Sequence, residues 1–151
     1  MKPLSVAEAL SKAAAYCAKG EHCAYDIREK LRQWGFQGDE TEDIVEKLLE
    51  QGFIDETRYA KAYINDKYRF AKWGRMKIEQ GLRMKQIPSA IFRPLMDAVI
   101  DKEEYQQILL ELLTQKRKNL KGEDEYQLKA KLVRFALQRG FTYEEVLYNI
   151  E

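Results

Sequence analysis

The chain has 151 residues, and its 26 Lys or Arg and 25 Asp or Glu residues leave a net charge of only +1. This length suits one ordinary domain, and no apolar stretch approaches the roughly 18 residues that a membrane span needs. Two cysteines are too few for a disulfide scaffold and the N-terminus lacks the apolar core of a secretory signal, so we expect a cytoplasmic protein.

Helix-forming residues dominate the composition, and the first third of the chain predicts three helices. Ser5 caps a helix that ends at Gly20. The second helix covers about 22–34, and the third is capped by Asp39 and terminated by Gly52. No run of alternating β-branched residues predicts a strand anywhere in the chain.

The middle third also predicts three helices. Asp55 caps a long helix whose apolar stripe extends to Phe70, and Gly74 provides the turn into the fifth helix. Pro88 stands at the start of the sixth helix, and Pro94 within it predicts a kink or a short helix.

The last third completes a set of nine helices. The seventh runs over about 101–120, and Gly122 separates it from the eighth, which carries Leu128 and Leu132. Thr142 and Glu145 form a capping box for the ninth.

One pattern of apolar residues, or phrase, occurs three times along the chain. Each copy has two apolar residues four apart in a helix, followed by the helix end and another apolar residue. The copies are Ile27, Leu31, Gly35 and Phe36; Ile78, Leu82, Gln86 and Ile87; and Leu132, Ala136, Gly140 and Phe141. They begin 51 and 54 residues apart. This spacing predicts an all-α fold of three tandem three-helix repeats, at about 1–52, 53–100 and 101–151, in an elongated array.

Basic residues gather in two blocks, and the first is interleaved with aromatic residues. Such a pattern suits single-stranded nucleic acid, through stacking and phosphate contacts, or a protein interface anchored by Trp and Arg. Solvated helix faces with a buried Phe70 and Trp73 are the simpler alternative. We expect the first partner-binding patch to comprise Arg69, Lys72, Trp73, Arg75, Lys77, Arg83 and Lys85, and the second Lys116, Arg117, Lys118 and Lys121.

Catalytic patterns are missing from the sequence. There is no glycine-rich phosphate loop and no serine elbow. Cys17, His22 and Cys23 lack a fourth ligand and the usual spacing of a zinc site. We therefore expect neither an enzyme nor a bound metal or cofactor.

The most specific stretch is Ile54-Asp55-Glu56-Thr57-Arg58-Tyr59-Ala60, followed by Gly74 through Leu82 and then Lys85-Gln86-Ile87. It resembles the signature of the RecX family of bacterial recombination regulators over about residues 20–150. A glutamine, Gln86, stands where the family usually has glycine at the helix end. The matching residues, to which we assign mostly structural roles, are Asp55, Arg58, Tyr59, Ala60, Gly74, Ile78 and Leu82.

The resemblance implies a curved stack of three three-helix repeats that binds the RecA recombinase, chiefly as its filament on single-stranded DNA. It also implies that the chain damps the ATPase, strand-exchange and co-protease activities of RecA. A monomer is expected, because the tandem repeats leave no spare apolar face.

Two other functions stay open on sequence grounds. The chain could be a stand-alone DNA-binding module, although the helix after Pro88 offers Arg93 as its one strong base-reading side chain. It could also be a scaffold for another protein. The affinity of a site with six phosphate contacts would fall about a thousandfold between 50 and 200 mM salt. A chain of net charge +1 is therefore poorly suited to holding bare DNA.

Overall fold

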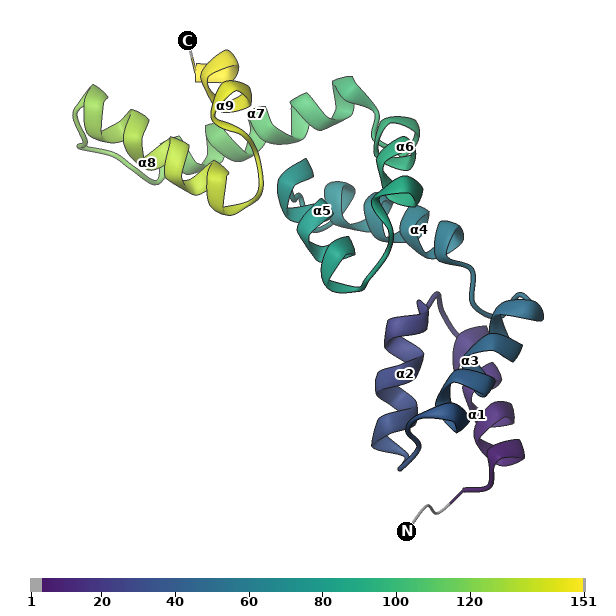
Figure 1. Cartoon of the computed structure of the whole chain (residues 1–151). Coiled ribbons are helices and arrows are strands. Elements are labelled where there is room, and N and C mark those ends of the chain that lie inside the picture. Colours follow the sequence, from purple (N-terminus) through teal and green to yellow (C-terminus); the bar gives the residue numbers. More distant parts are fainter. Residues whose placement is uncertain (1–3, 151) are drawn as a thin grey trace.

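The computed structural model describes residues 4–150, which form nine helices and no strand. The helices are α1 (Val6–Ala18), α2 (Ala24–Gln33), α3 (Asp39–Glu50), α4 (Glu56–Arg69), α5 (Arg75–Met84), α6 (Ser89–Val99), α7 (Lys102–Lys118), α8 (Glu125–Gln138) and α9 (Tyr143–Ile150). They form three successive triplets in an elongated, curved array, with α2, α5 and α8 along one side (Figure 1). The predicted all-α array is confirmed.

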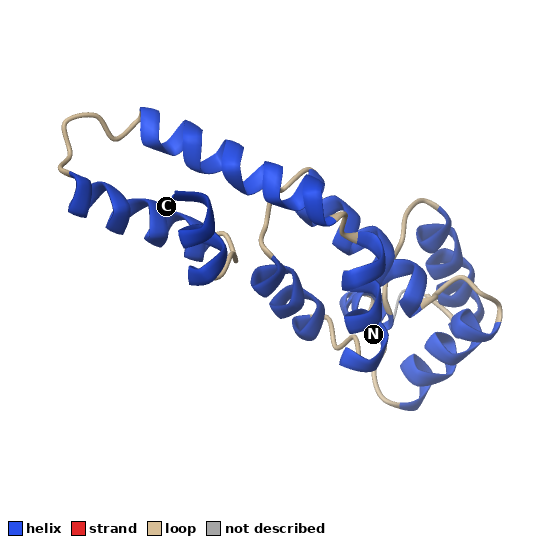
Figure 2. Ribbon diagram, turned by 90° about the horizontal axis from the view of Figure 1, so that it is seen from above, coloured by secondary structure: helices blue, strands red, loops and turns tan. Residues whose placement is uncertain are grey.

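Packing is densest inside each triplet, and the triplets are joined unequally. Helices contact one another within α1–α3, within α4–α6 and within α7–α9, and α4 also contacts α7. One hydrophobic cluster belongs to α1–α3 and the segment just after it, whereas a second runs through both later triplets and includes Cys23. The second and third triplets therefore share a continuous core. The view from above shows the same succession of triplets (Figure 2).

The thrice-repeated phrase forms the same helix end each time. The second apolar residue accepts a hydrogen bond from the amide of the residue five positions later, which closes a Schellman motif. These bonds are Phe36 N to Leu31 O at 2.9 Å, Ile87 N to Leu82 O at 3.0 Å and Phe141 N to Ala136 O at 3.0 Å. All six of these side chains are buried. The residue between them is left-handed, with φ of 90° at Gly35, 61° at Gln86 and 101° at Gly140. Gln86 thus keeps the backbone conformation that glycine adopts in the other two copies.

Two predicted helix starts are wrong in detail. Ser5 caps α1 as expected, accepting from the amide of Glu8 at 3.1 Å. However, Asp39 is the first residue of α3 rather than its cap, because the chain enters through Gly38 at φ 65°. The second helix starts at Ala24, because Cys23 is its N-cap. The backbone amide of Cys23 donates a hydrogen bond to the Asp26 carboxylate.

The link between α4 and α5 also differs from its prediction. Phe70 is 77% exposed and takes no part in the core, because α4 ends at Arg69 and the chain turns away. The left-handed residue of this turn is Lys72, at φ 58°, whereas Gly74 has an ordinary φ of −78°. Helix α6 continues through Pro94 from Ser89 to Val99.

Glycine is required at position 74 because a side chain would not fit there, and not because of its backbone conformation. A Cβ atom there would lie 2.2 Å from the carbonyl carbon of Gly140. At this point the backbones of the second and third triplets touch, and the Gly74 amide donates to Arg139 O at 2.7 Å. The Met76 amide donates to Gly140 O at 3.0 Å.

Candidate partner-binding surface

The first predicted patch centres on Trp73, which the structure places between two lysines. The Lys67 Nζ lies 4.7 Å from the centroid of the Trp73 ring, and the Lys77 Nζ lies 4.5 Å from it. Tyr63 meets the same indole edge to face, with ring centroids 6.4 Å apart. We call Tyr63, Lys67, Trp73 and Lys77 the Trp73 cluster. Cation–π contacts of this kind contribute about 0.5–2 kcal/mol each, so the indole and the two ammonium groups hold one another in place.

Sequence reasoning found half of this cluster. Trp73 and Lys77 were predicted site residues, and Tyr63 and Lys67 were not. The two missed residues are four apart on α4, which places them on one helix face. That spacing, combined with an aromatic residue in the following turn, is the signal that could have found them.

The turn beside the cluster is fixed by the third triplet. The guanidinium group of Arg139 donates to Ala71 O at 2.6 Å and to Lys72 O at 3.2 Å. These bonds hold the left-handed turn open, so that Lys72 and Phe70 both stand exposed beside Trp73.

Three of the predicted patch residues are already engaged in ion pairs with other helices. Their pairs are Arg69 with Glu104 at 2.6 Å, Arg75 with Asp97 at 2.9 Å and Lys85 with Asp26 at 2.7 Å. The hydrogen bond to Asp26 raises the pKa of Lys85, which keeps the ammonium group charged. Within residues 4–150, Lys72, Lys77 and Arg83 have no carboxylate partner. Two of the three pairs, those of Arg69 and Lys85, join different triplets, and the pair of Arg75 with Asp97 lies within the second triplet.

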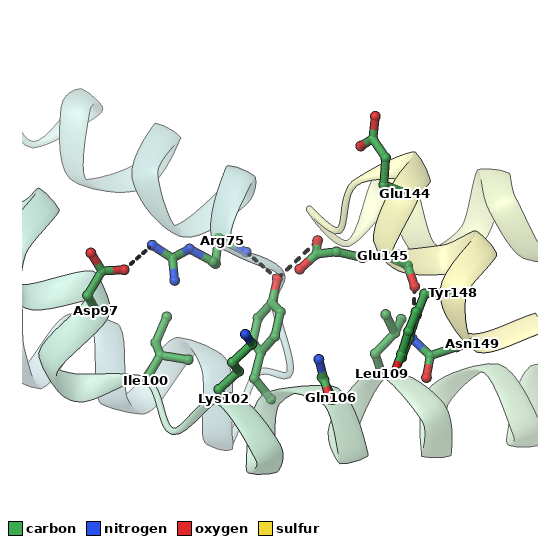
Figure 3. A pocket seen from close by; sticks show the side chains of 11 residues that line it. Arg75, Asp97, Ile100, Lys102, Gln106, Leu109, Glu144, Glu145, Tyr148 and Asn149 are labelled. Carbon is green, nitrogen blue, oxygen red and sulfur yellow. Dashed lines mark hydrogen bonds and ion pairs between the residues drawn. The ribbon is translucent and has the colours of Figure 1, made fainter.

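The Arg75 side chain pairs with Asp97 inside the second triplet, whereas its backbone reaches the third triplet (Figure 3). Its backbone amide donates to the Tyr105 hydroxyl at 2.9 Å, and that hydroxyl donates to Glu145 at 3.4 Å. Burial raises the pKa of Tyr105, so the phenol stays protonated. These groups line a hollow of about 530 Å³ between the second and third triplets. This arrangement links α5, α7 and α9.

The second predicted patch lies at the far end of α7. Lys116, Arg117 and Lys118 occupy its last turn, where positive charge complements the helix dipole. Lys116 covers the Phe135 ring at 5.2 Å, whereas the described part of the chain supplies no ion pair to Arg117, Lys118 or Lys121. The rise of α7 between Glu104, where Arg69 is held, and Lys118 is about 20 Å. The structure does not merge the two patches.

The family-signature residues lie in the core or at a junction between triplets, with Gly74 at the contact of the second and third triplets. Asp55 caps α4 by accepting from the Arg58 amide at 3.0 Å. Arg58 itself pairs with Glu21 and donates to Gly52 O at 3.2 Å, which ties α4 to the end of the first triplet. Four others are buried: Tyr59, Ala60, Ile78 and Leu82.

The residues considered for zinc serve packing. Cys17 and Cys23 lie in different hydrophobic clusters, and burial raises the pKa of Cys23 to about 11. His22 stacks on Tyr16 with ring centroids 4.0 Å apart. No three His, Cys, Asp or Glu side chains gather as metal ligands between residues 4 and 150. None of the helices described is long and apolar enough to cross a membrane.

These features define a class of protein: a tandem array of three-helix units whose middle unit displays lysines around an aromatic residue, joined to its neighbours by polar contacts. The chain belongs to the RecX family. The first, second and third three-helix domains of RecX match residues 9–48, 55–93 and 103–148.

Individual relatives agree with this assignment. The regulatory protein RecX of Clostridium acetobutylicum is 32% identical over 141 residues, which cover 91% of this chain and 65% of that protein. The RecX of Vibrio vulnificus is 26% identical, covering 88% of this chain and 84% of that protein. The chain spans 56% of the RecX of Clostridium perfringens, at 33% identity. The crystal structure of RecX from Lactobacillus salivarius has the same fold, with a TM-score of 0.82 at 19% identity, covering 96% of this chain and 94% of that one.

Proposed function

We propose that this chain is a negative modulator of the RecA recombinase. It binds the RecA filament on single-stranded DNA and inhibits the ATPase, strand-exchange and co-protease activities. Membership of a family of regulatory proteins supports the assignment. The observation that carries the choice of surface is the Trp73 cluster, beside which Phe70 and Lys72 are held exposed.

The available basic residues favour recognition of the filament over bare DNA. Three of the seven predicted patch residues already neutralise a carboxylate, so fewer cations remain for phosphates than the sequence suggests. Affinity for naked DNA should therefore be low and strongly dependent on salt. A filament presents protein surface together with phosphate, so a few lysines around an aromatic anchor can contribute to binding both.

The direct test is RecA-catalysed hydrolysis of ATP in the presence of single-stranded DNA as the chain is titrated in. Binding of the chain to the same DNA without RecA is measured in parallel. Inhibition accompanied by poor binding to bare DNA is the expected result. Absence of inhibition with strong binding to bare DNA would replace the proposal with a stand-alone DNA-binding module, which exposed Phe70 beside lysines would also suit.

Charge reversals identify the surface. Lys72→Glu combined with Arg83→Glu alters two exposed residues without an ion pair in the described structure, and should weaken inhibition at least tenfold with little change in melting temperature. Lys61→Glu, at an exposed lysine of α4 away from the cluster, is the matched control. Arg75→Glu is a poor probe, because it would place a carboxylate against Asp97. Full inhibition by the double variant would exclude this surface.

Lys118→Glu combined with Lys121→Glu tests the second patch in the same titration. Both side chains are exposed, so a loss of inhibition without loss of stability would assign them to the filament contact.

A further inference from the structure

Helix α8 carries a second apolar stripe, which borders the core at the partly buried Val133 and is otherwise exposed. Leu132 and Ala136 are buried, as is expected for a helix with one packed side. A separate row at positions i, i+4, i+7 and i+11 consists of Tyr126, Ala130, Val133 and Leu137. Tyr126 is 85% exposed and Leu137 is 46% exposed. This spacing forms a seam on which another helix can pack.

The stripe forms the floor of a groove. Tyr143 of α9, itself half exposed, stands beside it, and the groove between them has a volume of about 700 Å³. A smaller hollow shares Leu137 and Gln138 with this groove and continues to Met76 and Lys77 of α5. The surface therefore extends from the third triplet onto the second.

Comparison of the three triplets shows that the exposed leucine at position 137 is peculiar to α8. Leu137 stands three residues before the left-handed Gly140, and the same position is Arg32 in α2 and Arg83 in α5. Two copies of the helix thus place a charged side chain in water where the third copy exposes a leucine. An apolar side chain exposed where the other two copies are charged indicates a surface that a partner covers.

The charges around the groove select the partner. Arg134 lines the groove, and Lys77 lies in the adjoining hollow. Neither hollow is lined by Asp or Glu. A second copy of this chain packed through the same stripe would bring its own basic residues against these, which disfavours self-association. The apolar centre formed by Ala130, Val133 and Leu137 offers no donor for phosphates, which disfavours nucleic acid.

We propose that this groove, defined by Tyr126, Ala130, Val133, Arg134, Leu137 and Tyr143, binds an amphipathic helix with acidic flanks from a protein partner. The stripe rises about 16 Å along α8, which corresponds to three turns of the bound helix. Leucine-sized side chains of the partner contact the stripe, and its carboxylates face Arg134. The proposal goes beyond the proposed function, because it does not depend on which protein is regulated and shares only Lys77 with the predicted patch.

The test uses two stapled three-turn helical peptides with the same leucine seam, one flanked by glutamates and the other by lysines. Binding is followed by fluorescence anisotropy against the full chain. The glutamate peptide should bind at least tenfold more tightly than the lysine peptide, and raising the salt concentration should narrow the difference.

Two exposed positions give variants that leave the core intact. Leu137→Arg introduces the residue found at this position in the other two triplets and should weaken binding of the glutamate peptide at least tenfold. Arg134→Glu should weaken binding of the same peptide and strengthen binding of the lysine peptide. Leu110→Arg, which changes a leucine of α7 with a similar exposure of 40%, is the matched control and should leave binding unchanged. Thermal unfolding of each variant verifies that it is folded.

The proposal would be overturned if the two peptides bound equally or not at all. It would also be overturned if Leu137→Arg had no effect on binding of the glutamate peptide. Sedimentation that reveals a dimer abolished by Leu137→Arg would assign the stripe to a second copy. Binding of an oligothymidine that is lost in Leu137→Arg, without binding of the glutamate peptide, would assign it to nucleic acid.

Discussion

The contact between Gly74 and Gly140 provides the sharpest test of how the second and third triplets are joined. In Gly74→Ala the new Cβ atom would lie 2.2 Å from the carbonyl carbon of Gly140 and 2.3 Å from the amide nitrogen of Phe141. Both neighbours are backbone atoms, so neither can rotate away. The two triplets must separate at this point.

The expected cost follows from what separation disrupts. The bonds from Gly74 N to Arg139 O and from Met76 N to Gly140 O lengthen or break. Two hydrogen bonds at about 0.5–1.5 kcal/mol each and overpacking at about 1–3 kcal/mol predict a loss of roughly 2–6 kcal/mol.

Urea unfolding followed by circular dichroism measures this loss, and hydrogen exchange at the Met76 amide locates it. Gly20→Ala is the matched control, because no atom lies within 4 Å of its added Cβ. At such a site alanine should be neutral or stabilise by up to about 1 kcal/mol. A Gly74→Ala chain as stable as the parent, with Met76 equally protected, would refute the close backbone contact.

Three other substitutions test separate features. Gln86→Gly should stabilise the chain by about 0.5–1 kcal/mol in urea unfolding by relieving a left-handed glutamine, and the converse Gly35→Gln should destabilise it; opposite signs would contradict the shared helix end. Leu82→Ala should cost about 2–5 kcal/mol in the same assay, and no loss would remove Leu82 from the core. Burial raises the pKa of Glu56, so its contribution to stability is greatest below the ordinary carboxyl pKa of about 4.3 and is lost as the pH rises through the folded value. Glu56→Gln should therefore be more stable than the parent at pH 7, with the difference vanishing near pH 4, and a difference that grows on acidification would have the wrong sign.

Much of the local structure could be predicted because it depends on neighbours in sequence. The Schellman ends at Gly35 and Gly140 need only an apolar spacing and a residue that tolerates positive φ. Capping by Ser5 and Asp55 likewise involves groups three residues apart. Where the local signal was ambiguous, as at Gly38 and Asp39, the prediction failed by one residue, since either can precede a helix.

The candidate site was predicted less completely, because its groups come from different helices. The sequence places seven basic residues between Asp66 and Gln86, but it does not reveal that Glu104, Asp97 and Asp26 neutralise three of them. Those carboxylates lie between 22 and 59 residues away along the chain. Two of these ion pairs depend on how the triplets stack, and the pair of Arg75 with Asp97 depends on how α5 packs against α6.

The sequence by itself determined the helical class, the three-fold phrase and the family signature, since each is a pattern of residues close together in the chain. Tertiary structure alone decided which lysines remain available around Trp73, why Gly74 must be glycine and that α8 exposes an apolar stripe. The physical reason is that a charge, a missing Cβ atom or an exposed leucine acquires its role from the atoms opposite it. For Gly74, Arg69 and Lys85 those atoms belong to another triplet.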